Sequence, residues 1–163
     1  MNSPIGMTDS DILTRLAVRE DVARLLSLLP QISSRSGSLP TKTLGIKEST
    51  IIFDKISALK NVHIVVAESA DELVAALTIA VIPNLTYEGR PWAIIENVVV
   101  ARSQRRKGVG KRIMEFAFDL AAENGCYKVQ LLSGPNDDHV GFYRRVGLTD
   151  GTSRGFKKYF VER

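Results

Sequence analysis

Residues 94–120 read IIENVVVARSQRRKGVGKRIMEFAFDL, and this stretch decides both the fold and the chemistry of the chain. The apolar run at its start predicts a buried strand, and the spacing of apolar residues toward its end predicts an amphipathic helix. The loop between them contains Gly108 and Gly110. Glycine lets a ligand approach the backbone closely, and N–H groups at a helix N-terminus attract anions. The stretch therefore predicts a strand–loop–helix unit that binds phosphate groups.

The positive charge of the chain is concentrated in the same segment. The 163 residues include 22 Lys and Arg against 18 Asp and Glu, for a net charge of +4. A solvated basic face or a nucleic-acid patch would also explain such a run, but no aromatic side chains for base stacking are interleaved with the cations. We therefore expect a phosphate-bearing small molecule here and no nucleic-acid partner. The six cations are Arg102, Arg105, Arg106, Lys107, Lys111 and Arg112.

Two common phosphate-binding motifs do not fit the loop. A P-loop requires a glycine where the chain has Arg105, and the dinucleotide fingerprint requires one where it has Ile113. The residues from Arg105 to Gly110 instead match the signature Arg/Gln-x-x-Gly-x-Gly/Ala. At this point the chain resembles the GNAT superfamily of acyl-CoA-dependent N-acyltransferases. Asn136 and the run Phe142–Leu148 are similar to the second signature of that family, Asn…Phe-Tyr-x-x-x-Gly-Phe.

Length and composition indicate one globular domain over residues 1–163, with residues 1–10 as an unstructured lead. Hydrophobic residues make up 44% of the chain, but no apolar run approaches the roughly 20 residues of a membrane helix. We therefore expect no membrane association and, since no signal segment is evident, a cytoplasmic location. Cys126 has no partner for an internal disulfide, and no His and Cys residues have the spacing of a metal site.

Periodicity and turn signals predict elements in the order β-α-α-β-β-β-α-β-α-β. Antiparallel strands followed by a βαβ crossover indicate an α/β (α+β) fold, in which a mixed, mostly antiparallel central sheet has helices on both faces. This order agrees with the GNAT-like fold that the resemblance implies. In the second helix, we expect Ile52, Ile56 and Leu59 to form the buried stripe. The strands are expected at 13–18, 62–68, 73–82, 92–100, 128–132 and 156–161, and the helices at 20–29, 47–59, 108–124 and 137–146.

The resemblance also implies how the chain would hold acetyl-CoA. The backbone at the end of the strand over 92–100 would hydrogen-bond the pantetheine arm. Backbone amides from Arg106 to Lys111 would surround the pyrophosphate, and Asn136 matches an asparagine that often contacts the cofactor. No metal is implied. The residues expected to contact acetyl-CoA are Val98, Val99, Val100, Arg105, Arg106, Lys107, Gly108, Val109, Gly110, Lys111 and Asn136.

Two side chains are the candidates for catalytic proton transfer. Tyr143 matches the general acid of the family, and a phenol with a pKa of about 10 can protonate a departing thiolate. The alternative is a core aromatic. Glu96 is the one acid in an apolar strand, and its side chain shares a face with Val98 if no bulge intervenes. It would take a proton from the substrate amine or, alternatively, bond neighbouring backbone. Leu131 stands where some members place a catalytic glutamate, so the base stays open, with His139 as the next candidate.

Together these features predict an N-acetyltransferase that moves an acetyl group from acetyl-CoA to a primary amine by direct attack in a ternary complex. The acceptor is expected to be a small molecule. A protein N-terminal or lysine acetyltransferase and a non-catalytic acyl-CoA-binding module are the alternatives. Arg90 and Arg154 lie in loops expected at the acceptor site, where they would favour an acidic or phosphorylated acceptor. The amine, the acyl length and the oligomeric state stay open, although homodimers are common in such families.

Overall fold

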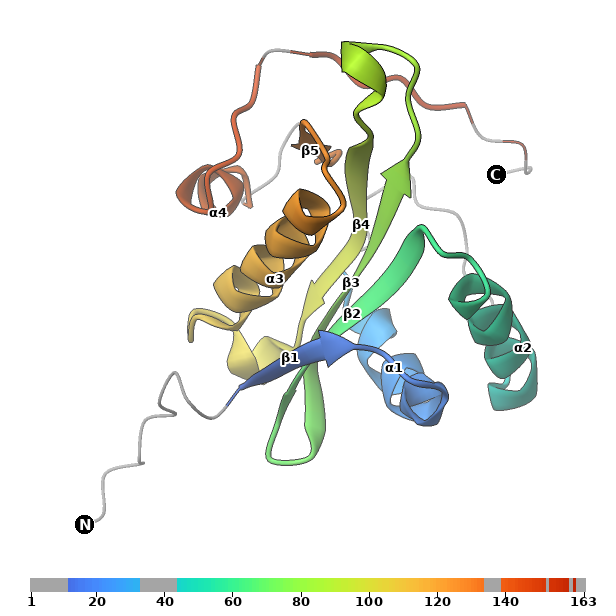
Figure 1. The fold of residues 1–163 in the computed structure, drawn as a ribbon. Helices are drawn as coiled ribbons and strands as arrows, with labels where there is room; N and C mark the ends of the chain where they lie inside the picture. The colour runs from blue at the N-terminus through green and yellow to red at the C-terminus, as the bar shows by residue number, and fades with distance from the viewer. Residues whose placement is uncertain (1–11, 33–43, 134–138, 152, 159, 161–163) are drawn as a thin grey trace.

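Five strands form one sheet in the computed structural model (Figure 1), which describes residues 12–32, 44–133, 139–151, 153–158 and 160. Neighbouring strands follow chain order; β1 to β4 are antiparallel, whereas β5 lies parallel to β4. The mixed, mostly antiparallel sheet predicted from the sequence is therefore confirmed. The strands are β1 (Leu13–Leu16), β2 (Val62–Ser69), β3 (Glu72–Ile82), β4 (Trp92–Val100) and β5 (Val129–Gln130).

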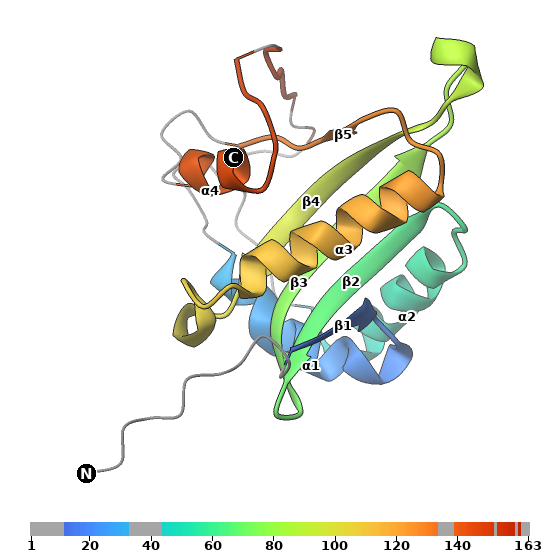
Figure 2. The ribbon, with the colours of Figure 1, turned by 60° about the vertical axis from the view of Figure 1, so that its left-hand side comes forward.

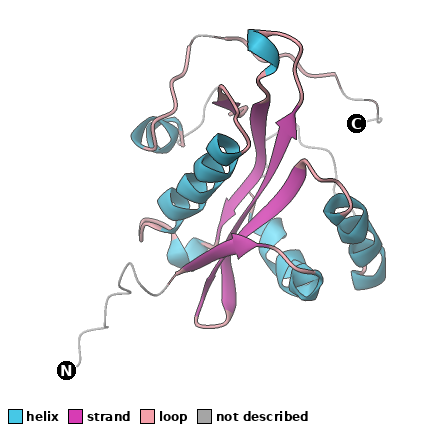
Figure 3. Ribbon diagram, in the orientation of Figure 1, coloured by secondary structure: helices cyan, strands magenta, loops and turns pink. Residues whose placement is uncertain are grey.

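Helices cover both faces of this sheet (Figures 2 and 3). On one face α3 places Ile113 and Met114 in a buried cluster with Leu77 of β3. On the opposite face α1 and α2 contribute Leu25 and Phe53 to a second cluster. Full burial of one such side chain stabilises the fold by about 1.5–3 kcal/mol, so the two clusters fix the helices on the sheet. The helices are α1 (Val22–Leu28), α2 (Ile46–Ser57), α3 (Val109–Glu123) and α4 (Val140–Arg145).

The hairpin expected between the second and third strands is present. Ser69 pairs with Glu72, and the two residues between them, Ala70 and Asp71, have φ values of 48° and 64°. Two successive left-handed residues give a tight turn whose twist matches that of the flanking strands. The polar joint in the sequence thus marked the turn correctly.

The first helix ends within one residue of the predicted position, whereas the second differs from the prediction. α1 ends at Leu28, and Pro30 lies in the 3₁₀ turn Leu29–Gln31 that follows, because proline has no N–H for a further α-helical hydrogen bond. In α2 the buried residue is Phe53, whereas Ile52 and Leu59 are 42% and 49% exposed. The larger aromatic side chain therefore decides which face of α2 packs on the sheet, and the stripe predicted through Ile52 and Leu59 was wrong.

The end of the chain departs furthest from prediction. β5 has two residues instead of five, and the described residues within 153–160 form no strand. A strand is expected over 156–161, but Phe156 and Phe160 are each 87% exposed. A strand is stabilised by hydrogen bonding and packing against a neighbour, and this segment has no strand neighbour among the described residues.

A buried carboxylate fixes the edge of the sheet at β1. Asp21, which is fully buried, accepts hydrogen bonds from both terminal nitrogens of Arg15, at 2.6 and 3.0 Å, and from the Val18 N–H at 2.8 Å. Arg24 also pairs with Asp21, and both arginines pair with Glu68 of β2. The bond from Arg15, with smaller contributions from Val18 and Arg24, lowers the pKa of Asp21 from 3.8 to about 2. The cluster thus joins β1, α1 and β2.

We predict that Asp21→Asn destabilises the protein at neutral pH by about 2–3 kcal/mol, because it removes the stabilisation that corresponds to the depressed pKa of Asp21 and leaves Glu68 as the one carboxylate partner of both arginines in the cluster. Since the pKa of Asp21 is depressed in the folded state, its stabilising contribution is complete above about pH 4 and disappears as the pH falls through 2. Urea unfolding at pH 7 and pH 3 measures both effects, and the gap between variant and wild type should narrow in acid. Asp54→Asn, which removes an exposed pair with Arg19 at 3.1 Å, is the control and should cost at most about 1 kcal/mol. Equal stability of Asp21→Asn and wild type at pH 7 would contradict this role.

Candidate active site

The edge of β4 that faces β5 is open over most of its length (Figure 2). β5 pairs with β4 through two residues, and no other described strand lies along this edge. The Ala101 N–H donates to the Val74 carbonyl of β3 at 2.8 Å. Because backbone groups alternate in direction along a strand, Val100 faces the open edge and Val99 is directed at β3. At the end of β4 an extended ligand can therefore bond the Val100 N–H, whereas the Val100 carbonyl already accepts a hydrogen bond from the Arg105 side chain.

Aromatic and cationic side chains hold the two strands together at the other end. The rings of Tyr87 and Tyr127 are stacked with their centroids 4.2 Å apart. The Nζ atom of Lys128 lies 5.3 Å from the Trp92 ring centroid and 5.6 Å from that of Tyr127. The Tyr127 N–H also donates to the Pro91 carbonyl at 2.9 Å. β4 and β5 thus form a wedge: these contacts hold the two strands together where β4 begins, and the strands are not paired where β4 ends.

The loop after β4 has the backbone geometry of an anion site. Arg106 and Gly108 have φ values of 63° and 83°, and Gly108 is the N-cap of the 15-residue α3. Left-handed residues alternating with others turn successive N–H groups toward one point, and the helix N-terminus adds partial positive charge. Arg106 and Lys107 are exposed beside this concavity. The donor set fits the phosphates of a coenzyme A molecule.

The cations of the segment have different roles, which the sequence did not reveal. The Nε of Arg105 donates to the Val100 carbonyl at 3.2 Å, and its Nη2 donates to the Gln31 carbonyl at 3.4 Å. The Gln31 side chain in turn accepts a hydrogen bond from the Arg102 N–H at 2.9 Å. Arg105 and Gln31 therefore anchor the loop to β4 and to the end of α1. No sequence signal identified Gln31, because it lies 71 residues from Arg102.

The two glycines of the signature are required for different reasons. Gly108 has a left-handed backbone, and a Cβ added there would meet nothing within 4 Å. Gly110 has no positive φ, but a Cβ there would lie 3.2 Å from the Cε2 and Cζ atoms of Phe142. Gly108 therefore serves backbone conformation, whereas Gly110 serves close packing against α4. Neighbouring Val109 is fully buried, so its backbone and not its side chain can face a ligand.

A bulge changes the expected placement of Glu96. Residue pairing shifts between Ala76 and Thr78 of β3, and Asn97 in β4 has a φ of 56°. Glu96 pairs with Thr78 and follows Ile95, which packs in the α3-side cluster together with Val98 and Val100. Glu96 is therefore exposed on the opposite face, toward α1 and α2. The condition that no bulge intervenes fails, and Glu96 does not share a face with Val98.

Tyr143 lies on α4, next to the loop and the open edge. Its ring centroid is 5.3 Å from that of Phe142, and its carbonyl accepts a hydrogen bond from the Leu148 N–H at 3.0 Å. Phe142 contacts the start of α3, so the two signatures of the sequence meet in space (Figure 1). Asn136 lies outside the described residues.

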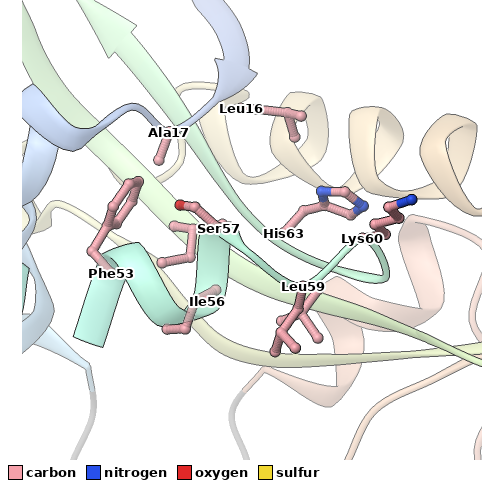
Figure 4. Close-up of a pocket in the computed structure, with 10 residues that line it drawn as sticks. Leu16, Ala17, Phe53, Ile56, Ser57, Leu59, Lys60 and His63 are labelled. Carbon is pink, nitrogen blue, oxygen red and sulfur yellow. The ribbon is translucent and has the colours of Figure 1, made fainter. Parts of the chain in front are cut away.

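A separate hollow of about 230 Å³ lies between α2 and the β1–β2 edge (Figure 4). Its lining combines apolar side chains such as Phe53 and Ile56 with the polar Ser57, Lys60 and His63. It shares no residue with β4 or with the loop at residues 101–108, which we call the phosphate loop. Among the described residues there is no cluster of three or more His, Cys, Asp or Glu suited to a metal, and no helix long and apolar enough to cross a membrane.

Comparison with known proteins agrees with this geometry. The sequence profile of the Acetyltransferase (GNAT) family matches residues 31–148. Glucosamine 6-phosphate N-acetyltransferase of Candida albicans is 30% identical over 107 residues, which cover 64% of this chain and 70% of that protein. Glucosamine 6-phosphate N-acetyltransferase 1 of Oryza sativa subsp. japonica is 31% identical over 134 residues, 80% and 76% of the two chains. The crystal structure of the Arabidopsis thaliana glucosamine-6-phosphate N-acetyltransferase superposes with a TM-score of 0.79 at 25% identity, covering 92% of this chain and 99% of that one.

An unpaired strand edge that leads to a glycine-rich helix start is the arrangement expected of an acyl-CoA-dependent N-acyltransferase. The chain belongs to the GNAT acetyltransferase family, as its two signatures suggested. The predicted enzyme class is confirmed by the same matches.

We predict that Gly108→Ala weakens acetyl-CoA binding about tenfold, because a left-handed alanine costs roughly 1–2 kcal/mol and relaxation of the loop would misdirect its N–H groups. Calorimetric titration with acetyl-CoA measures the change. Gly125→Ala is the matched control, since Gly125 has a φ of 73°, meets nothing within 4 Å and lies at the far end of α3. The Gly125→Ala variant should be destabilised as much as Gly108→Ala but should bind acetyl-CoA with the affinity of the wild type. Equal affinity losses in both variants would mean that the effect is global and that Gly108 has no special role.

Proposed function

We propose that the chain transfers an acetyl group from acetyl-CoA to a primary amine on a small, phosphorylated molecule. The observation that carries the proposal is the open β4 edge, which runs into a backbone anion site flanked by exposed cations. When bound, acetyl-CoA supplies the acetyl group as a thioester. Its pantetheine arm would bond the Val100 N–H, since the Val100 carbonyl is bonded by Arg105, and its pyrophosphate would bond the amides from Arg106 to Lys111.

The acceptor assignment rests on the relatives and on one loop. The two curated relatives acetylate glucosamine 6-phosphate, so an amino sugar phosphate is the first candidate substrate. Arg90 lies at the closed end of the wedge, where its Nη2 donates to the Cys126 carbonyl at 3.5 Å. Arg154 precedes Gly155, whose backbone packs tightly on Leu132. Leu132 follows β5, at the end of the wedge where β4 and β5 are not paired. Arg154 is therefore the better candidate for an acceptor phosphate.

Two groups would handle protons during the reaction. The attacking amine must first be neutral, and the exposed carboxylate of Glu96 could accept its proton directly or through water. Because Glu96 lies on the α1/α2 face, the amine would approach the thioester from that face. Tyr143 would donate its phenolic proton to the departing thiolate, since α4 lies on the side of the sheet that carries α3 and the phosphate loop.

A thiol-release assay with acetyl-CoA tests the function. The kcat/KM for glucosamine 6-phosphate should be at least about tenfold higher than that for glucosamine. Glucosamine has no phosphate group and cannot make a bidentate contact with an arginine. A peptide amine is the comparison substrate. Turnover with the peptide alone would reassign the acceptor to proteins, and acetyl-CoA binding without turnover on any amine would make the chain a non-catalytic binding module.

Tyr143→Phe removes one hydroxyl group and tests the acid. If Tyr143 protonates the thiolate, kcat should fall by roughly 10²–10⁴-fold while the acetyl-CoA dissociation constant stays nearly the same. Tyr127→Phe, at the closed end of the wedge, is the control and should keep its activity. A Tyr143→Phe variant with wild-type kcat would return Tyr143 to a packing role.

Glu96→Gln keeps the size of the side chain and removes its charge. The variant should lose most activity near neutral pH and regain part of it at high pH, where the free amine is already neutral. A pH–rate profile from pH 6 to pH 10 measures the recovery. A profile that coincides with that of the wild type would show that another group or water takes the proton.

A further inference from the structure

We infer that Phe142 is a positioning residue: its ring packs on Gly110 at the start of α3 and thereby sets the position of Tyr143. The inference rests on the proposed role of Tyr143 as the acid. It gives Gly110 a part in the chemical step, in addition to any part in binding phosphate.

The contact at Gly110 is between a helix backbone and an aromatic ring. Two ring atoms of Phe142 lie 3.2 Å from where a Cβ of residue 110 would be, and the Cγ2 atom of Val100 lies 3.6 Å from it. The backbone of Gly110 is in a conformation that any residue adopts, since its φ is not positive. The absence of a side chain is therefore required by the ring and by close packing, not by backbone geometry.

The side chains of α4 are at most partly buried. α4 has six residues, and none of its side chains is fully buried. Phe142, together with Val146 and Leu148 just after the helix, packs against the α3-side cluster as a partly buried side chain. The Phe142 ring lies against Gly110 at the start of α3, and Tyr143 follows Phe142 directly in the chain. A displacement of the Phe142 ring is therefore expected to move the Tyr143 hydroxyl.

The size of the displacement depends on the side chain placed at residue 110. An alanine Cβ at 3.2 Å requires the ring to shift by a few tenths of an ångström, and a valine requires more because its methyl groups extend beyond Cβ. Misplacement of a catalytic group by about 1 Å can lower the rate about 100-fold. The backbone amides at the start of α3 keep their positions, so acetyl-CoA should still bind.

The test is a double-mutant cycle with Gly110→Val, Phe142→Leu and the double variant. Gly110→Val should lower kcat by roughly 10- to 100-fold, with the acetyl-CoA dissociation constant changed less than about threefold. Because leucine is smaller than phenylalanine, it leaves room for the valine, and the kcat of the double variant should be at least about threefold higher than that of Gly110→Val. Gly110→Ala, with a smaller effect of the same kind, replaces Gly110→Val if the latter does not fold.

A readout without turnover separates this inference from the proposed function. With tyrosine-labelled full-length protein, the Tyr143 ring resonance, assigned from Tyr143→Phe, should shift in the Gly110 variant and return toward wild type in the double variant. If the resonance shifts and returns in this way but no amine is acetylated, Phe142 does position Tyr143 and the proposed function is refuted. A large loss of acetyl-CoA affinity in Gly110→Val with no recovery in the double variant would overturn the inference, as would an unshifted Tyr143 resonance.

Discussion

The short pairing between β4 and β5 is the constraint on which the candidate site depends. Two residue pairs join the strands, and the stack of Tyr87 on Tyr127 holds that end closed. Beyond Ile94 the edge of β4 has no strand neighbour among the described residues. Backbone N–H and carbonyl groups need hydrogen-bond partners, so such an edge requires water, a loop or an extended ligand. A molecule with amide groups along its length satisfies that requirement without disturbing either buried cluster.

Side-chain hydrogen bonds tie the loop after β4 to the rest of the structure. Arg105 bonds the end of β4 and, with Gln31, joins the loop to the end of α1. The Arg105 side chain and the Arg102 N–H are therefore already bonded within the protein. Arg106 and Lys107 stay exposed beside the backbone concavity. A site that is already ordered loses less conformational entropy on binding, which favours affinity for a polyanion in water.

The opposite edge of the sheet is stabilised by a different device. Asp21, Arg15, Arg24 and Glu68 join β1, α1 and β2 through charges that are largely withdrawn from water. Removing one carboxylate from such a cluster is costly because the remaining charge is solvated only in part. β3 lies between this cluster and β4, so the cluster and the candidate site share no residue.

The sequence by itself determined the strand–loop–helix unit, the hairpin at residues 69–72 and the family, since each depends on local pattern and turn chemistry. It did not determine which way Glu96 points, because one extra residue in β4 opposite β3 reverses the alternation that follows. Nor did it distinguish Gly108 from Gly110: the first is required by its own φ, and the second by a ring that lies 32 positions later in the chain. The aromatic run at the end of the chain had the local preference of a strand, but the described part of it found no neighbouring strand to pair with. Only the tertiary structure decided these points, because each depends on contacts between residues that are distant in sequence.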